Sequence, residues 1–243
     1  MRNVAIIQAR MGSSRLPGKV LLPLADKTVL AHVINRVSSV PQIDEVVIAT
    51  TINSIDDPIV EEATRLGASV YRGSEGHVLS RYYEAAIRSK ADTVVRITSD
   101  CPVIDPAITD AVITFYNEQA VDYASNTIER TFPRGLDTEV FSMESLERAY
   151  HEANTESQFE HVTPYLYQHP ELFKLAFFTG KEDHSEHRWT LDTAEDYQLL
   201  TEIYNRLYSS NQMFHWKEVL ELMHENPDLL LINAHIEQKK LNE

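Results

Sequence analysis

Apolar and polar positions follow two different periods along the first half of the chain. Short apolar runs, as in buried strands, alternate with longer stretches in which apolar residues return every three or four positions, as on one face of a helix. The predicted strands are residues 4–8, 45–51, 68–73 and 92–100. The predicted helices are residues 28–40, 56–67, 77–90 and 106–119. In the second of them, Asp57 is the expected N-cap, Pro58 the first helical residue and Gly67 the residue that ends the helix.

This alternation defines the expected fold class. Each helical crossover is long enough for the next strand to return parallel to the previous one, which predicts an α/β fold with a doubly wound, mostly parallel sheet. Ligands of such sheets bind beyond the carboxyl ends of the strands. We therefore expect the segments that follow residues 4–8 and 92–100 to open at one edge of the sheet.

The pattern is less regular in the second half of the chain. The predicted elements are a strand, turn and strand over residues 122–142, helices over 142–153 and 156–169, a strand over 173–180, a short strand running into a helix over 188–208, and a terminal helix with an apolar segment over 216–233. Thr193 and Asp196 form a capping signature for the helix in 188–208. Because the chain contains no repeat, low-complexity run or linker, we expect a single domain over residues 1–243.

The composition limits which classes of molecule the protein can be expected to bind. The formal net charge is −15, which argues against a nucleic-acid partner, because a duplex requires a basic surface. A small anion in a locally basic pocket remains compatible with this charge. The single cysteine, Cys101, excludes a disulfide framework. No apolar stretch approaches the roughly 20 residues of a membrane span, so we expect a cytoplasmic protein that does not bind membranes.

The stretch QARMGSSRLPGK, residues 8–19, concentrates positive charge directly after the first predicted strand. Gly12 and Gly18 allow the backbone to approach a ligand, while Arg10, Arg15 and Lys19 can donate charge-assisted hydrogen bonds to phosphate oxygens. The stretch matches neither the P-loop nor the dinucleotide-binding pattern. The alternative is a surface loop whose cations are solvated.

Two aspartates are candidate metal ligands. Asp100 is predicted to end the last strand of the first half, where a carboxylate can hold Mg²⁺ against a phosphate; the alternative is that it caps the turn before Pro102. Asp192 is predicted to end the short strand before the capped helix, and it is the natural second ligand if Asp100 is the first. We expect Asp105 to be a helix cap and Cys101 to be a small buried side chain.

Other polar residues are candidates for a substrate pocket. They are Arg134, Asp137 and Glu139, which alternate with apolar residues and could equally form an exposed strand face, and Glu160 with His161. His184 and His187 match no zinc-binding spacing, so we expect them to be structural.

Four stretches resemble the cytidylyltransferase family, which includes the enzymes that make CMP-activated 3-deoxy-manno-octulosonate and CMP-sialic acid. They are residues 4–37, 72–86, 94–106 and 188–197, in the family's order, and the nearest branch is that of spore coat polysaccharide biosynthesis. The resemblance implies a nucleotide-diphospho-sugar transferase (Rossmann-like, GT-A-like) fold with a small inserted lobe at about 122–168. It also implies a homodimer formed through that lobe, in which we expect Phe132, Phe141, Tyr165 and Tyr167 to exceed what the lobe itself can bury.

The same resemblance implies a role for each candidate residue. The loop would grip the CTP triphosphate through Arg10, Gly12, Ser13, Ser14, Arg15 and Lys19, with the base near Ala9. Asp100 and Asp192 would bind Mg²⁺ and would form the catalytic set with Arg10 and Lys19. Arg81 would lie in the nucleotide pocket, although Ser80 stands where relatives often have Asp. The sugar side would include Arg134, Asp137, Glu139, Glu160 and His161.

The activity implied is transfer of CMP from CTP to a sugar or sugar acid, with release of pyrophosphate, in cell-surface or spore coat polysaccharide biosynthesis. Two alternatives remain open from the sequence. One is a glycosyltransferase of the same fold that uses a nucleotide-sugar donor, and the other is a non-catalytic nucleotide-binding protein of a polysaccharide operon.

Overall fold

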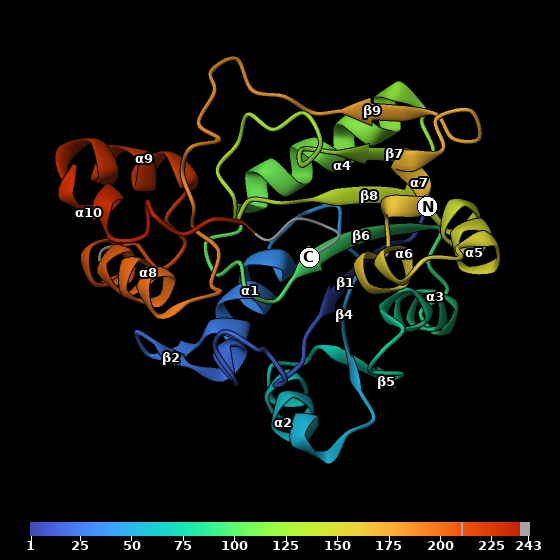
Figure 1. The fold of residues 1–243 in the computed structure, drawn as a ribbon, viewed down its shortest axis with the longest axis horizontal. Coiled ribbons are helices and arrows are strands. Elements are labelled where there is room, and N and C mark those ends of the chain that lie inside the picture. The colour runs from blue at the N-terminus through green and yellow to red at the C-terminus, as the bar shows by residue number, and fades with distance from the viewer. Residues whose placement is uncertain (210, 239–243) are drawn as a thin grey trace.

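A seven-stranded sheet forms the centre of the molecule in the computed structural model, which describes residues 1–209 and 211–238 (Figure 1). The strands in spatial order are β5 (Ser69–Gly73), β4 (Glu45–Thr51), β1 (Asn3–Gln8), β6 (Thr93–Thr98), β8 (Glu139–Ser142), β7 (Tyr123–Ser125) and β9 (Leu175–Phe177). The short strands β2 (Pro23–Leu24) and β3 (Lys27–Thr28) form a separate hairpin.

The pairing of the strands confirms the predicted doubly wound, mostly parallel sheet. β1 pairs in parallel with both β4 and β6, and β4 pairs in parallel with β5. β8 is antiparallel to its neighbours β6 and β7, while β9 returns parallel to β7. The carboxyl ends of β1 and β6 therefore lie together at one edge, as the order of strands and helices predicted.

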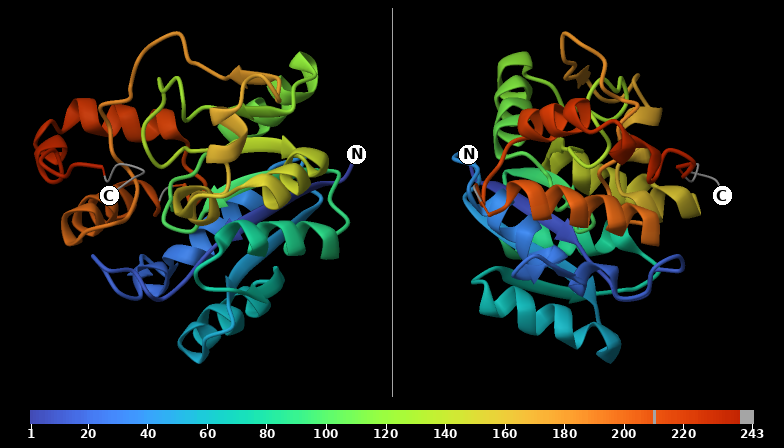
Figure 2. Two further views of the ribbon diagram at one scale, coloured as in Figure 1. Left: turned by 45° about the vertical axis from the view of Figure 1, so that its right-hand side comes forward. Right: turned by 90° about the vertical axis from the view of Figure 1, so that its left-hand side faces the viewer.

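Helices cover both faces of the sheet (Figure 2). They are α1 (Val29–Ser38), α2 (Asp57–Arg65), α3 (Val78–Arg88), α4 (Pro106–Gln119), α5 (Met143–Glu152), α6 (Glu156–His161), α7 (Pro164–Gln168), α8 (Ala194–Leu207), α9 (Trp216–Glu225) and α10 (Asp228–Leu231). Alternate residues of β1 serve two separate cores, because successive side chains of a strand point to opposite faces. Ala5 and Ile7 pack with α1, α4 and α8, whereas Val4 and Ile6 pack with α3 and α5.

Residues 122–168, the expected inserted lobe, contribute to this central architecture. They supply β7 and β8 to the sheet and the helices α5 to α7, of which α5 and α6 pack against α3. Phe132, Phe141 and Tyr165 are each no more than 5% exposed within the chain itself, and Tyr167 is half-buried. The first three rings are therefore not left over for a partner, and a dimer contact there remains a prediction from the resemblance alone.

Three predicted elements differ in their details. The expected helix over 156–169 is divided into α6 and α7 at Val162, whose φ is 72°. Pro164 is the first residue of α7, a position where the missing amide hydrogen of proline costs no helical hydrogen bond. The strand expected at 188–192 is reduced to a single bridge between Arg188 and Arg134. The N-cap of α2 is Asp56 instead of Asp57. None of the helices in residues 1–209 and 211–238 is long and apolar enough to cross a bilayer.

Candidate active site

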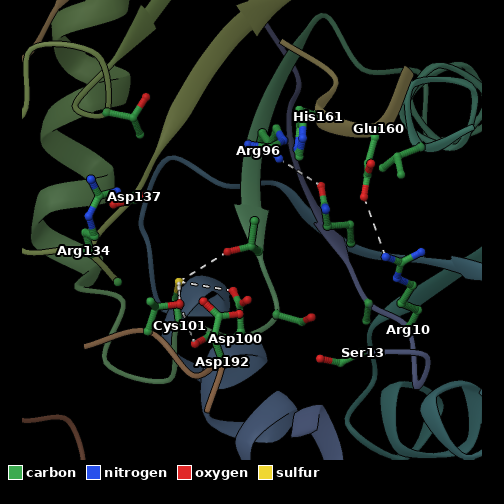
Figure 3. Close-up of a pocket in the computed structure, with 18 of the residues that line it drawn as sticks. Arg10, Ser13, Arg96, Asp100, Cys101, Arg134, Asp137, Glu160, His161 and Asp192 are labelled. Atoms are coloured by element: carbon green, nitrogen blue, oxygen red, sulfur yellow. Dashed lines mark hydrogen bonds and ion pairs between the residues drawn. The ribbon is translucent and has the colours of Figure 1, made fainter. Parts of the chain in front are cut away.

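A cavity of about 890 Å³ lies at the carboxyl ends of β1 and β6 (Figure 3). Its walls come from the loop after β1, the turn after β6, the segment leading into β8, the α6–α7 region and residues 190–192. Among the predicted site residues, Gly12 is the one that lies outside this lining. Of the two glycines predicted in the basic loop, Gly18 has left-handed backbone, with φ of 71°, and it directly precedes the 3-10 turn that begins at Lys19.

Lys19 joins the two predicted metal-binding aspartates. Its Nζ lies 2.7 Å from Asp100 Oδ2, 2.8 Å from Asp192 Oδ1 and 2.7 Å from the Leu191 carbonyl oxygen. Burial opposes the charge on Lys19, but the two carboxylates outweigh it and raise the lysine pKa. Burial likewise disfavours ionised Asp100, yet the neighbouring ammonium lowers the pKa of that carboxyl. Two carboxylates thus already converge on one cation.

Neither aspartate ends a strand, which corrects the sequence prediction. β6 ends at Thr98, so Asp100 lies in the turn beyond it, and Asp192 lies in the irregular segment before α8. The two segments are joined because the Leu191 amide donates to the Asp100 carbonyl at 2.8 Å. Backbone pairing between two loops, not the end of a regular strand, therefore brings the carboxylates together.

Arg188 was missed by sequence reasoning. Its buried guanidinium lies 2.7 Å from Asp192 Oδ2 and 2.9 Å from Asp196 Oδ1. Burial opposes the charge on Arg188, but both carboxylates raise its pKa. Asp196 also accepts from the Asp192 amide at 2.9 Å while it completes the predicted capping box with Thr193. The four-residue spacing of Arg188, Asp192 and Asp196 was the available signal, because such residues share a helical face or a tight turn.

The cations of the basic loop line the same cavity. Arg15 Nη2 lies 3.0 Å from Asp192 Oδ2, and Arg10 Nη2 lies 3.8 Å from Glu160 Oε1. The loop folds back through hydrogen bonds from the Ser13 and Gly18 amides to the Met11 carbonyl, at 2.9 and 3.0 Å. Ser13 and Ser14 also face the cavity. Three cations of this loop thus surround a concave space that can accept an anion.

Arg81 reaches the cavity from α3. Its Nη1 donates to the carbonyls of Ser74 at 2.6 Å and Glu75 at 3.2 Å, and burial lowers its pKa. Within the described chain its buried Nε has no hydrogen-bond partner. Ser80, by contrast, bonds to His77 at the start of α3 through both its amide and its hydroxyl group, so it serves the helix end.

Arg96 on β6 is a second residue that sequence reasoning missed. Its guanidinium forms an ion pair with Glu139 and donates to Gln8 Oε1 at 3.2 Å. Glu139 also accepts from the hydroxyls of Tyr123 at 2.6 Å and Thr163 at 2.7 Å. The available signal was a lone charge inside an apolar strand, because such a group requires a partner.

The remaining candidates lie around other parts of the cavity wall. Asp137 pairs with Arg130 through two bonds of 2.6 and 2.8 Å. The Arg134 side chain has no carboxylate partner among the described residues, and burial together with Arg130 lowers its pKa. Burial also lowers the pKa of His161. In Figure 3, Arg134 and Asp137 lie apart from the pair of Arg10 and Glu160, with Asp100 and Asp192 below.

Two further expectations are confirmed by the geometry. Asp105 caps α4 by accepting from the Ala107 amide at 2.8 Å, and it also accepts from the Trp216 amide at 2.8 Å. Cys101 is a buried thiol, and burial raises its pKa well above the usual value. A thiol of this kind is a poor nucleophile.

The aspartate pair has the chemistry expected of a site for a hard divalent cation. Asp100 and Asp192 present oxygen donors, which Mg²⁺ prefers, and such sites use one or two carboxylates together with substrate phosphates. The Lys19 ammonium lies within 2.8 Å of both carboxylates, so the space between them accommodates a cation. The residues present therefore fit a divalent metal ion.

Comparison with known proteins agrees with this fold. The family model for cytidylyltransferase matches residues 4–235. The spore coat polysaccharide biosynthesis protein SpsF of Bacillus subtilis is 34% identical over 92% of this chain and 94% of that protein. A cytidylyltransferase structure from Leptospira borgpetersenii has a TM-score of 0.90 and 34% identity, covering 99% of this chain and 100% of that one.

A more distant structure shares the fold. CMP:2-keto-3-deoxy-manno-octonic acid synthetase, solved in complex with CTP, has a TM-score of 0.67 at 18% identity and covers 85% of this chain and 99% of that one. The fold is that of a nucleotidyltransferase. Within that class, the chain belongs to the cytidylyltransferase family.

Proposed function

We propose that this protein transfers CMP from CTP to a sugar or sugar acid and releases pyrophosphate, in cell-surface or spore coat polysaccharide biosynthesis. The observation that carries the proposal is the contact of Lys19 with Asp100 and Asp192, at 2.7 and 2.8 Å, beside the basic loop of the cavity. Family membership, a relative named for spore coat polysaccharide biosynthesis and a shared fold with a synthetase bound to CTP support it.

The loop after β1 would bind the triphosphate. Arg10, Arg15 and Lys19 line one cavity with the loop backbone, and together they would neutralise the phosphates and stabilise the departing pyrophosphate. Arg81, whose Nε has spare donor capacity, would contact the nucleotide from α3. Nucleotidyl transfer depends mostly on positioning and charge stabilisation, so the chain's cations and carboxylates would supply what the reaction requires.

Asp100 and Asp192 would hold Mg²⁺. When bound, this ion supplies Lewis-acid stabilisation of phosphate charge and favours ionisation of the acceptor hydroxyl. Arg188 and Asp196 would orient the Asp192 carboxylate, because both are buried and hydrogen-bonded to it or to its backbone. No separate general base would then be needed.

The acceptor would occupy the other side of the cavity. Arg134 lacks a carboxylate partner within the described chain, so it would bind an anionic group of the acceptor, which favours a sugar acid over a neutral sugar. Glu139, held by Arg96, and Asp137, held by Arg130, would accept hydrogen bonds from sugar hydroxyl groups, together with Glu160 and His161. The proposal includes a cytoplasmic homodimer, which rests on the resemblance.

Pyrophosphate release tests the proposal directly. Purified protein would be incubated with CTP, Mg²⁺ and a panel of neutral and acidic sugars, with pyrophosphate measured by a coupled assay and the product identified by mass spectrometry. Acceptor-dependent pyrophosphate together with a CMP-sugar mass is the expected result. A glycosyltransferase would release no pyrophosphate from CTP, and a non-catalytic protein would bind CTP without turnover, so either outcome would overturn the proposal.

A further inference from the structure

The segment between β9 and α8 brings two histidines and a carboxylate together outside the nucleotide cavity. One donor atom each from His184, Glu186 and His187 lies within 4.8 Å of the others. His187 Nε2 is 3.4 Å from Glu186 Oε1, and His184 Nε2 is 3.6 Å from a second carboxylate, Glu182 Oε2. These residues lie outside the lining of the nucleotide cavity, so they form a separate cluster.

The backbone fixes both histidines. The His187 amide donates to the His184 carbonyl at 3.2 Å, which closes a turn. The His184 amide donates to the Thr131 carbonyl at 2.8 Å, and the Arg134 amide donates to the His187 carbonyl at 3.0 Å. The two imidazoles therefore project from a turn that is tied at both ends to a neighbouring segment, and little conformational entropy remains to be lost on binding.

The two rings are also held by tryptophans. His187 stacks on Trp189 with ring centroids 5.5 Å apart, and His184 meets the edge of Trp216 at 5.7 Å. The His187 side chain is only 10% exposed, and its Nδ1 has no hydrogen-bond partner in the part of the chain that the structure describes. A buried polar atom without a partner is rare, so the hydrogen-bonding capacity of this ring is not satisfied by the protein alone.

The donor set defines the kind of ion. Two imidazoles and a carboxylate are the ligands of many zinc sites, whereas Mg²⁺ and Ca²⁺ prefer oxygen donors alone. If the three donor atoms stood at the 4.8 Å limit of their separations, an ion equidistant from them would lie about 2.8 Å from each. Each side chain would then close by less than ~1 Å to reach zinc-ligand distances of about 2.0–2.2 Å. Glu186, whose side chain is 66% exposed, is free to make such a movement.

We propose that His184, Glu186 and His187 form a binding site for a late first-row divalent metal ion, represented by Zn²⁺, with Glu182 or water as the fourth ligand. This replaces the purely structural role expected for the two histidines from the sequence. The site is open to solvent at Glu186 and Glu182, so its ion would brace the turn. The braced turn pairs with Arg134 and leads directly into Arg188, so the ion would steady the segment from which Arg188 reaches Asp192.

Zinc titration of the full chain tests the site. Chelator-treated protein would be titrated calorimetrically with Zn²⁺ in excess Mg²⁺, which saturates any oxygen site at Asp100 and Asp192. We expect one equivalent of Zn²⁺ to bind with micromolar or tighter affinity. The variants His184→Ala and Glu186→Gln should each weaken binding by at least about tenfold, while His224→Ala, an exposed histidine of α9, should bind as the wild type does.

A second readout separates ligand loss from misfolding. Zn²⁺ should raise the melting temperature of the wild type and of His224→Ala clearly more than that of Glu186→Gln, whose exposed side chain can change without disturbing the core. Co²⁺ should give the visible absorption of a site with imidazole ligands in the wild type and lose it in His184→Ala. Failure of the wild type to bind Zn²⁺, or unchanged affinity in both ligand variants, would overturn the proposal.

Discussion

The Asp100 carboxylate is the residue for which activity and stability should separate most clearly. Asp100→Asn keeps the size of the side chain but removes a charge that the proposed metal ion requires. We expect kcat for pyrophosphate release to fall by about three orders of magnitude or more. The melting temperature should change little, because Lys19 keeps its contacts with Asp192 and Leu191.

Asp105 provides the matched control. It is buried and bonded to the Ala107 and Trp216 amides, so Asp105→Asn should lower the melting temperature and leave kcat near the wild-type value at a temperature where the protein stays folded. Calorimetric melts and rates measured side by side check both variants. Activity close to wild type in Asp100→Asn would mean that this carboxylate only organises the turn.

Lys19 should compete with the metal ion in the absence of nucleotide. Its ammonium already contacts both carboxylates, and Asp192 Oδ2 is occupied further by Arg15 and Arg188. A divalent ion must therefore displace a cation. We expect Lys19→Met to bind Mn²⁺ at least about tenfold more tightly than the nucleotide-free wild type, because the ion no longer has to displace the ammonium. A tenfold gain in affinity corresponds to about 1.4 kcal/mol of binding free energy.

Electron paramagnetic resonance of free Mn²⁺ measures this affinity. Arg10→Met is the appropriate control, because it removes one positive charge from the same cavity without touching either aspartate: Arg10 is 3.8 Å from Glu160. Equal gains in both variants would mean that overall charge, not direct competition, controls metal binding.

At the scale of elements, the residue that ends α4 has a left-handed backbone conformation, and alanine at this position lowers stability. Ala120 follows the helix with φ of 48° and is exposed, and glycine adopts this conformation at lower cost. Ala120→Gly should therefore raise the free energy of unfolding by about 1 kcal/mol. Ala107→Gly, an exposed position in the first turn of the same helix, should instead lower it by roughly 0.5–1 kcal/mol. Urea unfolding of the two variants measures these changes in the free energy of unfolding, which should have opposite signs.

Helix α1 contains a histidine that makes stability depend on pH. His32 is 4% exposed, its Nε2 donates to the Leu24 carbonyl at 2.7 Å, and burial, together with Lys27 and Arg36, lowers its pKa to about 4. Between pH 6.5 and 4 the unfolded chain binds a proton that the folded protein excludes. The free energy of unfolding should thus fall by about 3 kcal/mol over this range from His32 alone.

Urea unfolding across that range, compared with His32→Gln, isolates this contribution, because glutamine can keep a hydrogen bond to Leu24 without titrating. The variant should lose less stability than the wild type between pH 6.5 and 4. Parallel curves for the two proteins would exclude His32 as the cause.

At the scale of the whole molecule, periodicity predicted the framework better than the contacts that cross it. Apart from the small hairpin of β2 and β3, the strands and helices up to α4 followed from local patterns, and Asp100 and Asp192 were paired although neither ends a strand. Arg96 was missed because its partner Glu139 becomes a neighbour only in the folded chain. Arg188 was missed although its partners Asp192 and Asp196 follow it at four-residue spacing. The burial of Phe141 likewise depends on β8 pairing with β6, and that of Phe132 depends on Phe178 and Trp216, which are distant in sequence.

The cavity joins segments from residue 8 to residue 192 and beyond, so a ligand that binds there should stabilise the whole fold. In the presence of Mg²⁺, CTP at about 100 times its dissociation constant should add ~2.7 kcal/mol to the free energy of unfolding. This corresponds to a rise in melting temperature of roughly 5–10 °C for a chain of this size.

At equal concentration CMP should raise the melting temperature much less, because it lacks the β- and γ-phosphates that Arg15 and Lys19 would contact. UTP should also give a smaller rise, since polar groups that bond the cytosine edge are left unpaired by uracil. Arg15→Met should abolish most of the difference between CTP and CMP. Equal shifts for both nucleotides in the wild type would place the triphosphate elsewhere and leave the basic loop without its proposed role.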